Sequence, residues 1–298
     1  MKQQIFRGTG TAIVTPFTRE DGAVDYTALD RLMERQIAGG VEAVVPLGST
    51  GEGATLTHEE KLALVDFVLE RARGRATVVA GTGTNDTITT VHLTREMASL
   101  GVDAVLVVSP YYNKPTVDGL MKHYGAVADA VATPIILYNV PGRTGSNLSA
   151  ETTLQLAEAI PSIVGIKEAS GNVDQVMEII RNRPEGFQVL SGEDTLTLPI
   201  VAAGGDGVIA VVSNEVPRMY SDMTRAALAG NFARARELHY TLLPLMKANF
   251  LESNPIPVKA ALAMMGLLDD VLRLPLTPLS EKHRASLRAA LQTAGALA

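Results

Sequence analysis

The chain of 298 residues contains no cysteine and no tryptophan. The lack of cysteine excludes disulfide bonds, thiolate metal ligands and a cysteine nucleophile, and it fits a reducing compartment, so we expect a cytoplasmic protein. Aromatic residues are also scarce, at 4% of the chain, whereas hydrophobic residues as a whole reach 46%. A sizeable core is therefore available, and it has to be built mainly from Ala, Val, Leu and Ile.

Long apolar runs and clusters of basic residues are missing as well. No segment approaches the ~20 consecutive apolar residues of a membrane helix, and residues 1–8 lack the apolar stretch of a signal peptide. The formal net charge is −6 and the isoelectric point is near 5.5. We therefore expect a soluble protein without a membrane or nucleic-acid partner.

Motifs for metal and phosphate binding are lacking too. The run Gly81-Thr82-Gly83-Thr84 is similar to a phosphate-binding turn, but Asp86 stands where the third glycine would be. The histidines are scattered, and no two of them have the spacing of metal ligands on one helix face. They are His58, His92, His123, His239 and His283. The sequence predicts no metal site and no bound cofactor.

Short β-branched segments recur through the first three quarters of the chain, with helical patterns between them. Helix starts are marked by Asp25, by a capping box at Thr57 and by Ser149. Eight strands alternating with helices predict an α/β fold, a closed (β/α)8 TIM barrel. An open doubly wound sheet is the alternative, which the even spacing disfavours. The predicted strands are Thr11–Thr15, Ala43–Leu47, Thr77–Ala80, Ala104–Val108, Ile135–Tyr138, Ile163–Lys167, Gln188–Leu190 and Gly207–Ala210.

The alternation stops near Gly230. The rest of the chain has helical patterns only, at Phe232–Asn249, Pro257–Leu267 and Ser280–Thr293. We therefore predict a catalytic barrel over residues 1–230 and a C-terminal helical region over residues 231–298.

Reactive side chains follow several of the predicted strands, at the face where such barrels hold their active sites. The most informative is Lys167, because it ends the apolar run Ile163–Ile166. Burial disfavours the charged form of an amine, and a neutral amine attacks a carbonyl carbon to form an imine. The alternative is a surface lysine paired with its neighbour Glu168.

Imine chemistry needs a proton shuttle, and the neighbouring strand ends in Tyr138. Its hydroxyl would be polarised by donating to Ser49 or Thr50, and Tyr112 would extend this relay outward. Arg143 carries a planar guanidinium that binds a carboxylate in a fork. The backbone amides of residues 49–51 would hold a second carboxylate. The set predicts imine chemistry on a small keto acid.

Five segments in combination resemble the 4-hydroxy-tetrahydrodipicolinate synthase family, a branch of the pyruvate-dependent class I aldolases. The resemblance covers essentially the whole chain. It implies a lyase that joins pyruvate, held as an imine on Lys167, to L-aspartate 4-semialdehyde, in the first committed step of lysine (diaminopimelate) biosynthesis. It also implies a homotetramer built as a dimer of dimers. The segments are GSTGE at 48–52, SPYYNKP at 109–115, YNVPGRTG at 138–145, GIKEASG at 165–171 and NPIPVK at 254–259.

The resemblance also implies roles for single residues. Tyr138, Ser49 and Tyr112 would form the proton relay, with Tyr112 reaching in from a neighbouring subunit. Thr50 would bind the carboxylate of pyruvate, and Arg143 would bind that of the semialdehyde. Two further positions, Gly192 and Ile209, would touch substrate mainly through their backbone.

A regulatory site is implied in the same way. Lysine-sensitive members of the family form an allosteric pocket at a subunit interface, from positions that match His58, Lys61, Asn85, Thr89 and Tyr111 here. Lys61 and Thr89 stand where sensitive members often have His and Glu. The anion that would neutralise the ammonium of lysine is then missing, so we expect weak inhibition by lysine.

One departure from the family pattern bears on the substrate. The usual loop is GTTGE, and Ser49 takes the place of its first threonine. Because that serine is common in related lyases, a pyruvate-dependent aldolase acting on a sugar acid or another keto acid is an alternative. Arg143 argues against it, since a sugar-acid site has less use for that arginine. A third hypothesis, a non-catalytic sensor of pyruvate-like acids, is disfavoured by the joint presence of Lys167, Tyr138 and Arg143.

Overall fold

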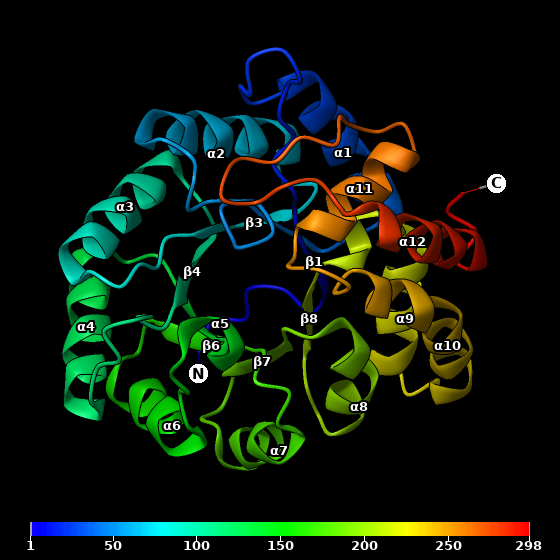
Figure 1. Ribbon diagram of the computed structural model, residues 1–298. Helices are drawn as coiled ribbons and strands as arrows, with labels where there is room; N and C mark the ends of the chain where they lie inside the picture. The colour runs from blue at the N-terminus through cyan, green and yellow to red at the C-terminus, as the bar shows by residue number, and fades with distance from the viewer. Residues whose placement is uncertain (1, 298) are drawn as a thin grey trace.

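Eight parallel strands close into a barrel in the computed structural model, which describes residues 2–297 (Figure 1). The strands are adjacent in chain order, and β8 returns to pair with β1, so the predicted TIM barrel is confirmed and the open sheet is wrong. The strands are β1 Gly8–Ala12, β2 Ala43–Val45, β3 Thr77–Gly81, β4 Ala104–Val108, β5 Ile135–Asn139, β6 Ile163–Glu168, β7 Gln188–Ser191 and β8 Gly207–Ala210.

Helices surround the barrel, and three more lie against its β8 side at the C-terminal end of the chain (Figure 1). The surrounding helices are α1 Tyr26–Gly39, α2 His58–Ala72, α3 Thr87–Leu100, α4 Val117–Ala130, α5 Pro141–Thr144, α6 Ala150–Ala159, α7 Val173–Asn182, α8 Thr197–Ala202 and α9 Pro217–Leu228, with short 3₁₀ turns η1 Asp194–Leu196 and η2 Val212–Asn214. The C-terminal helices are α10 Phe232–Ala248, α11 Ile256–Met264 and α12 Glu281–Thr293.

The predicted helix starts are confirmed by their hydrogen bonds. Asp25 caps α1 by accepting from the Ala28 amide. Thr57 and Glu60 form both halves of the capping box of α2, and Ser149 caps α6. These side chains satisfy backbone N–H groups that a helix leaves unpaired at its first turn.

The first strand is the main correction to the sequence prediction. Gly8–Ala12 forms β1, three residues before the predicted Thr11–Thr15. Glycine has a low strand propensity, so Gly8 and Gly10 hid this strand. The barrel nevertheless needs a glycine here, because a Cβ on Gly10 would lie 2.9 Å from the Phe6 ring. The second strand also ends early, at Val45, since Pro46 follows and Leu47 has a φ of 63°.

Two hydrophobic layers hold the barrel together. Side chains that point inward fill its interior, and those that point outward pack against the helices. The inward layer includes Ala12, Val45, Val79, Leu106, Ile136, Tyr138, Val164, Leu190 and Ile209. A further cluster joins β8 and α9 to α10, α11 and α12 through Tyr220, Leu242 and Leu291. The C-terminal helices therefore share a core with the barrel, and the division at residue 230 stays a prediction about chain organisation.

Within residues 2–297, no helix is both long enough and apolar enough to cross a bilayer.

Candidate active site

Lys167 lies at the carboxyl end of β6 and is 6% exposed. It pairs in register with Tyr138 on β5 and with Leu190 on β7, so the three side chains point into the barrel. The Lys167 Nζ atom sits over the Tyr138 ring, 4.4 Å from its centroid. The predicted adjacency of these two residues is thus present at the end of the barrel where such folds do chemistry.

The alternative of an ion pair between Lys167 and Glu168 is wrong. Glu168 points to the other side of β6, where its carboxylate accepts hydrogen bonds from Asn139, Gln175 and the Ser170 amide at 2.6 to 2.9 Å. Within residues 2–297, no carboxylate lies at ion-pair distance from Lys167. A lysine amine held in a buried cavity is the kind of group that forms an imine with a carbonyl substrate.

The loop after β2 brings Ser49 and Thr50 to the same cavity as Lys167. Leu47 starts it in a left-handed conformation, with φ 63°, and tight packing keeps it in place, because a Cβ on Gly53 would lie 2.3 Å from the Leu47 carbonyl oxygen. Thr50 is 3% exposed, whereas Ser49 is exposed. No hydrogen bond joins the Tyr138 hydroxyl to either residue in the described chain, so the three hydroxyls share a cavity without a direct contact.

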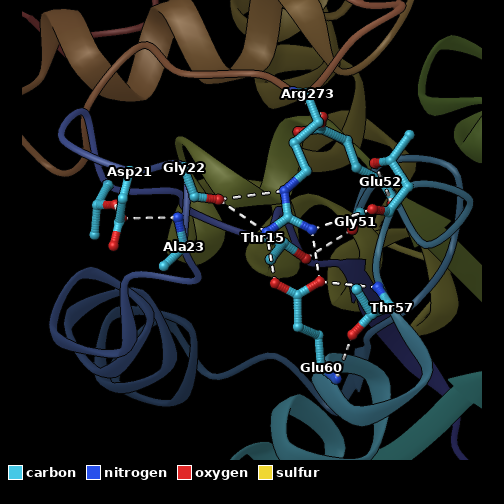
Figure 2. Close-up of polar contacts among 11 residues, drawn as sticks. Thr15, Asp21, Gly22, Ala23, Gly51, Glu52, Thr57, Glu60 and Arg273 are labelled. Atoms are coloured by element: carbon cyan, nitrogen blue, oxygen red, sulfur yellow. Dashed lines mark hydrogen bonds and ion pairs between the residues drawn. The ribbon is translucent and has the colours of Figure 1, made fainter.

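A buried ion pair anchors the far end of that loop. The Lys259 Nζ atom of α11 donates to a Glu52 oxygen at 2.6 Å and to the Thr15 carbonyl at 2.9 Å, and the two paired side chains are 0% and 1% exposed. Burial lowers the pKa of Lys259, and the Glu52 carboxylate opposes that shift. Arg273 donates its backbone N–H to the other Glu52 oxygen and binds both oxygens of Glu60, as Figure 2 shows.

Arg143 stands at the mouth of the cavity. It is exposed, lies on the short helix α5 beyond the end of β5, and donates from Nη2 to the Asn254 carbonyl oxygen at 3.0 Å. With Lys167 buried and Arg143 at the rim, a cavity of about 50 Å³ has a nucleophile at its base and a guanidinium at its opening. That arrangement suits a small carbonyl acid followed by a second, anionic reactant.

The comparisons with known proteins decide the family. Residues 5–294 match the model of the dihydrodipicolinate synthetase family. The chain belongs to this family. The 4-hydroxy-tetrahydrodipicolinate synthase of Koribacter versatilis is 50% identical over 292 residues, which cover 98% of this chain and 97% of the relative.

Solved structures of dihydrodipicolinate synthases have the same fold. The protein from Thermotoga maritima is 45% identical, with a TM-score of 0.96 over 99% of this chain and 100% of that one. The protein from Cyanidioschyzon merolae, solved with lysine bound, is 40% identical, with a TM-score of 0.95 over 99% of this chain and 100% of that one. The lyase activity expected from the sequence is thus the activity named for relatives that match nearly the whole chain.

Of three other predicted site residues, one lines the cavity and two do not. Gly192 lines it, and a Cβ there would lie 2.5 Å from the Ala169 Cβ, so the position needs a glycine. Ile209 is fully buried in the barrel interior, and Val211, two residues later, lines the cavity instead. Tyr112 is 88% exposed with a φ of 70° and does not line the cavity of its own chain.

Sequence reasoning missed two polar residues of the cavity, Glu193 and Asn254. Burial and the nearby Asp194 raise the pKa of Glu193, whereas Lys167 and Arg143 oppose that shift. Burial also raises the pKa of Asp194 to about 6, against the effect of the Val212 and Val211 amides that it accepts from. Glu193 follows the end of β7 by two residues, so a longer list of strand-end residues would have found it.

A second cavity, of about 450 Å³, opens beside the first and shares Ser49 and Tyr138 with it. Of the five residues predicted for an allosteric pocket, Lys61, Asn85, Thr89 and Tyr111 line this cavity. His58 does not, and its Nε2 atom lies 3.0 Å from Glu96. Asp86 also lines the cavity, and its carboxylate accepts from the Thr89 amide at 2.7 Å.

Within residues 2–297, no three His, Cys, Asp or Glu side chains are grouped as a metal site would require.

Proposed function

We propose that this protein is a 4-hydroxy-tetrahydrodipicolinate synthase, which condenses pyruvate with L-aspartate 4-semialdehyde in lysine (diaminopimelate) biosynthesis. The observation that supports this most is the buried Lys167 over the Tyr138 ring, with Arg143 at the mouth of the same cavity. Full-length relatives with that activity in their names agree with it.

The first steps use the amine of Lys167. It attacks the keto carbon of pyruvate, water leaves, and the imine loses a methyl proton to become an enamine. The enamine carbon then attacks the aldehyde of the second substrate. Attack of that substrate's own amino group on the imine carbon releases Lys167 and closes the ring, so one water is produced for each pair of substrates.

The surrounding residues bind the substrates and move protons. In this proposal Thr50 donates to the carboxylate of pyruvate, and Arg143 binds the carboxylate of the semialdehyde. Tyr138 and Ser49 carry protons between the substrates and a Tyr112 from a neighbouring subunit. The Gly192 backbone completes the contacts with substrate, and Val211, which lines the cavity, takes the place first predicted for Ile209.

We also propose a homotetramer, built as a dimer of dimers, that works in the cytoplasm. Exposure of 88% and a left-handed φ are unfavourable for a tyrosine on a free surface, and they are explained if Tyr112 fits into another subunit. A chain without cysteine suits a reducing compartment.

Borohydride reduction in the presence of pyruvate tests the covalent step. We expect peptide mass spectrometry to find a reduced pyruvyl group on the peptide that contains Lys167, and Lys167→Arg to lose nearly all activity because arginine stays protonated. The exposed Lys122 is the control: Lys122→Arg should keep both label and activity. Label on Lys259 or another lysine, or none at all, would overturn the mechanism.

The acceptor is tested separately. A coupled assay with L-aspartate 4-semialdehyde should give product, and retro-aldol assays with sugar acids should not. The opposite result would favour the related aldolases over the synthase.

A further inference from the structure

Asn254 lies deep in the candidate site, although none of the roles above uses its side chain. It is 5% exposed and lines the cavity with Lys167. Its Nδ2 atom donates to the Thr50 hydroxyl oxygen at 2.9 Å, and its backbone carbonyl accepts from Arg143 at 3.0 Å. One residue thus contacts both groups that are proposed to bind substrate carboxylates.

The direction of the hydrogen bond to Thr50 has a chemical consequence. A hydroxyl has one proton to donate and two lone pairs to accept with. Because the amide N–H of Asn254 occupies a lone pair, the proton of Thr50 points elsewhere. The Thr50 hydroxyl has no other hydrogen-bond partner within residues 2–297. That proton is therefore free for an acceptor in the cavity, and a carboxylate is such an acceptor.

The oxygen atom of the same side-chain amide indicates that Asn254 is not present for stability alone. The Asn254 Oδ1 atom is buried and has no hydrogen-bond partner in the described chain. An unpaired buried acceptor lowers stability, so an apolar residue would suit the folded protein better at this atom. Polar groups kept at such a cost are expected where a site needs them.

We propose that Asn254 is a positioning residue for substrate binding. Its side-chain amide directs the Thr50 hydroxyl so that it donates to the carboxylate of pyruvate, while its backbone carbonyl holds Arg143 for the carboxylate of the second substrate. The inference rests on the proposed function. The two contacts use different parts of one residue, so substitution of the side chain removes the first and leaves the second.

The test compares Asn254→Asp with Asn254→Ala by steady-state kinetics with both substrates. The aspartate has the same shape but accepts the Thr50 proton and places a negative charge beside the incoming carboxylate. We expect the KM for pyruvate to rise roughly tenfold or more in Asn254→Asp and only about threefold in Asn254→Ala. The KM for the semialdehyde should stay within about twofold of wild type in both.

Three further measurements separate this role from simple packing. The pyruvate defect of Asn254→Asp should ease as the pH falls and the new carboxylate becomes protonated, whereas that of Asn254→Ala should not. Asn254→Ala should add no loss in a Thr50→Val background, because it acts through Thr50. The melting temperature of the single variant Asn254→Ala should not fall below that of wild type.

The outcomes distinguish this inference from the proposed function. If borohydride and pyruvate fail to label Lys167 in the wild type, the proposed function and this inference both fall. If the wild type is labelled but Asn254→Asp binds pyruvate as well as Asn254→Ala does, or if both substrates are affected equally, only the inference is overturned. Should Asn254→Asp not fold, the cycle of Asn254→Ala with Thr50→Val decides: additive losses would contradict it.

Discussion

Lys167 and Arg143 occupy different depths of one cavity, and this separates their proposed tasks. Lys167 is buried at the carboxyl end of β6. Arg143 is exposed on α5 and reaches the cavity from its rim. A residue at the base acts on the first substrate, and a residue at the mouth acts on the reactant that arrives second.

Arg143→Ala is therefore expected to weaken use of the semialdehyde far more than imine formation. Loss of one charge-assisted contact should lower kcat/KM for the semialdehyde roughly ten- to hundredfold. Borohydride trapping of pyruvate should stay close to wild type. Arg181→Ala removes an exposed arginine from the last turn of α7 and serves as the control, with unchanged kinetics. Failure of trapping in a folded Arg143→Ala protein would refute the assigned role.

For single residues, the rule that active sites lie at the carboxyl ends of strands predicted most of the cavity lining but not Asn254. Lys167 and Tyr138 line the cavity from the carboxyl ends of their strands, Thr50 and Arg143 line it from the loops that follow, and a list of strand ends finds all four. Asn254 follows a helix and meets Thr50 across 204 residues of chain. No local pattern carries a contact of that length, so only the folded chain revealed it.

The elements contributed by the C-terminal region fix the loop that carries Ser49 and Thr50. Lys259 of α11 donates to Glu52. Arg273 binds Glu52, Glu60 and the Gly22 carbonyl (Figure 2). Helical periodicity predicted the C-terminal helices within a few residues, except that α11 ends three residues early, at Met264. It did not indicate that Lys259 would be buried, because a charged residue in a helical pattern is expected to be exposed.

Lys259→Met is expected to lower the free energy of unfolding by about 3–5 kcal/mol, because it leaves the buried carboxylate of Glu52 without a counter-ion. The double variant Glu52→Gln with Lys259→Met should recover part of that loss, since no charge is then left unpaired. Denaturant unfolding at one fixed protein concentration measures both. Lys122→Met, which removes an exposed lysine, is the control. Equal stability of Lys259→Met and wild type would show that the ion pair does not hold the loop.

The strand that the sequence misplaced has a physical explanation of its own. β1 contains two glycines, which local propensity counts against a strand. They are present because the barrel brings the Glu42 side chain against Gly8 and the Phe6 ring against Gly10. Tertiary packing therefore overrode the local preference at Gly8 and Gly10, and no window of neighbouring residues contains that information.

For the whole assembly, the proposed relay requires a tyrosine from another subunit. We expect Lys167→Arg and Tyr112→Phe to be strongly impaired when each is prepared alone. Refolded together, they should regain activity, because a mixed pair contains one site with an intact lysine and an intact neighbouring tyrosine. The same refolding of Lys167→Arg alone is the control. If the mixture is no more active than its parts, Tyr112 does not act across the subunit boundary.

The second cavity bears on regulation of the assembly. We expect L-lysine to inhibit weakly, since Lys61 adds a cation to the cavity and Thr89 supplies no charge to pair with the effector's ammonium. A steady-state titration with L-lysine at subsaturating pyruvate measures this. Thr89→Glu combined with Lys61→His should increase sensitivity. Strong inhibition of the wild type below millimolar lysine would contradict the prediction and direct attention to the Asp86 carboxylate.

The contacts of Asn254, Lys259 and Arg273 with the loop at residues 48–52 also matter during synthesis on the ribosome. The loop is translated early, yet its partners come more than 200 residues later. A nascent chain that has already made all eight strands still lacks the groups that orient Thr50 and neutralise Glu52. Catalytic competence should therefore arrive late, and a chain cut short before Asn254 would carry the nucleophile without a finished binding site. In this protein, synthesis of the C-terminal region, rather than closure of the barrel, completes the active site.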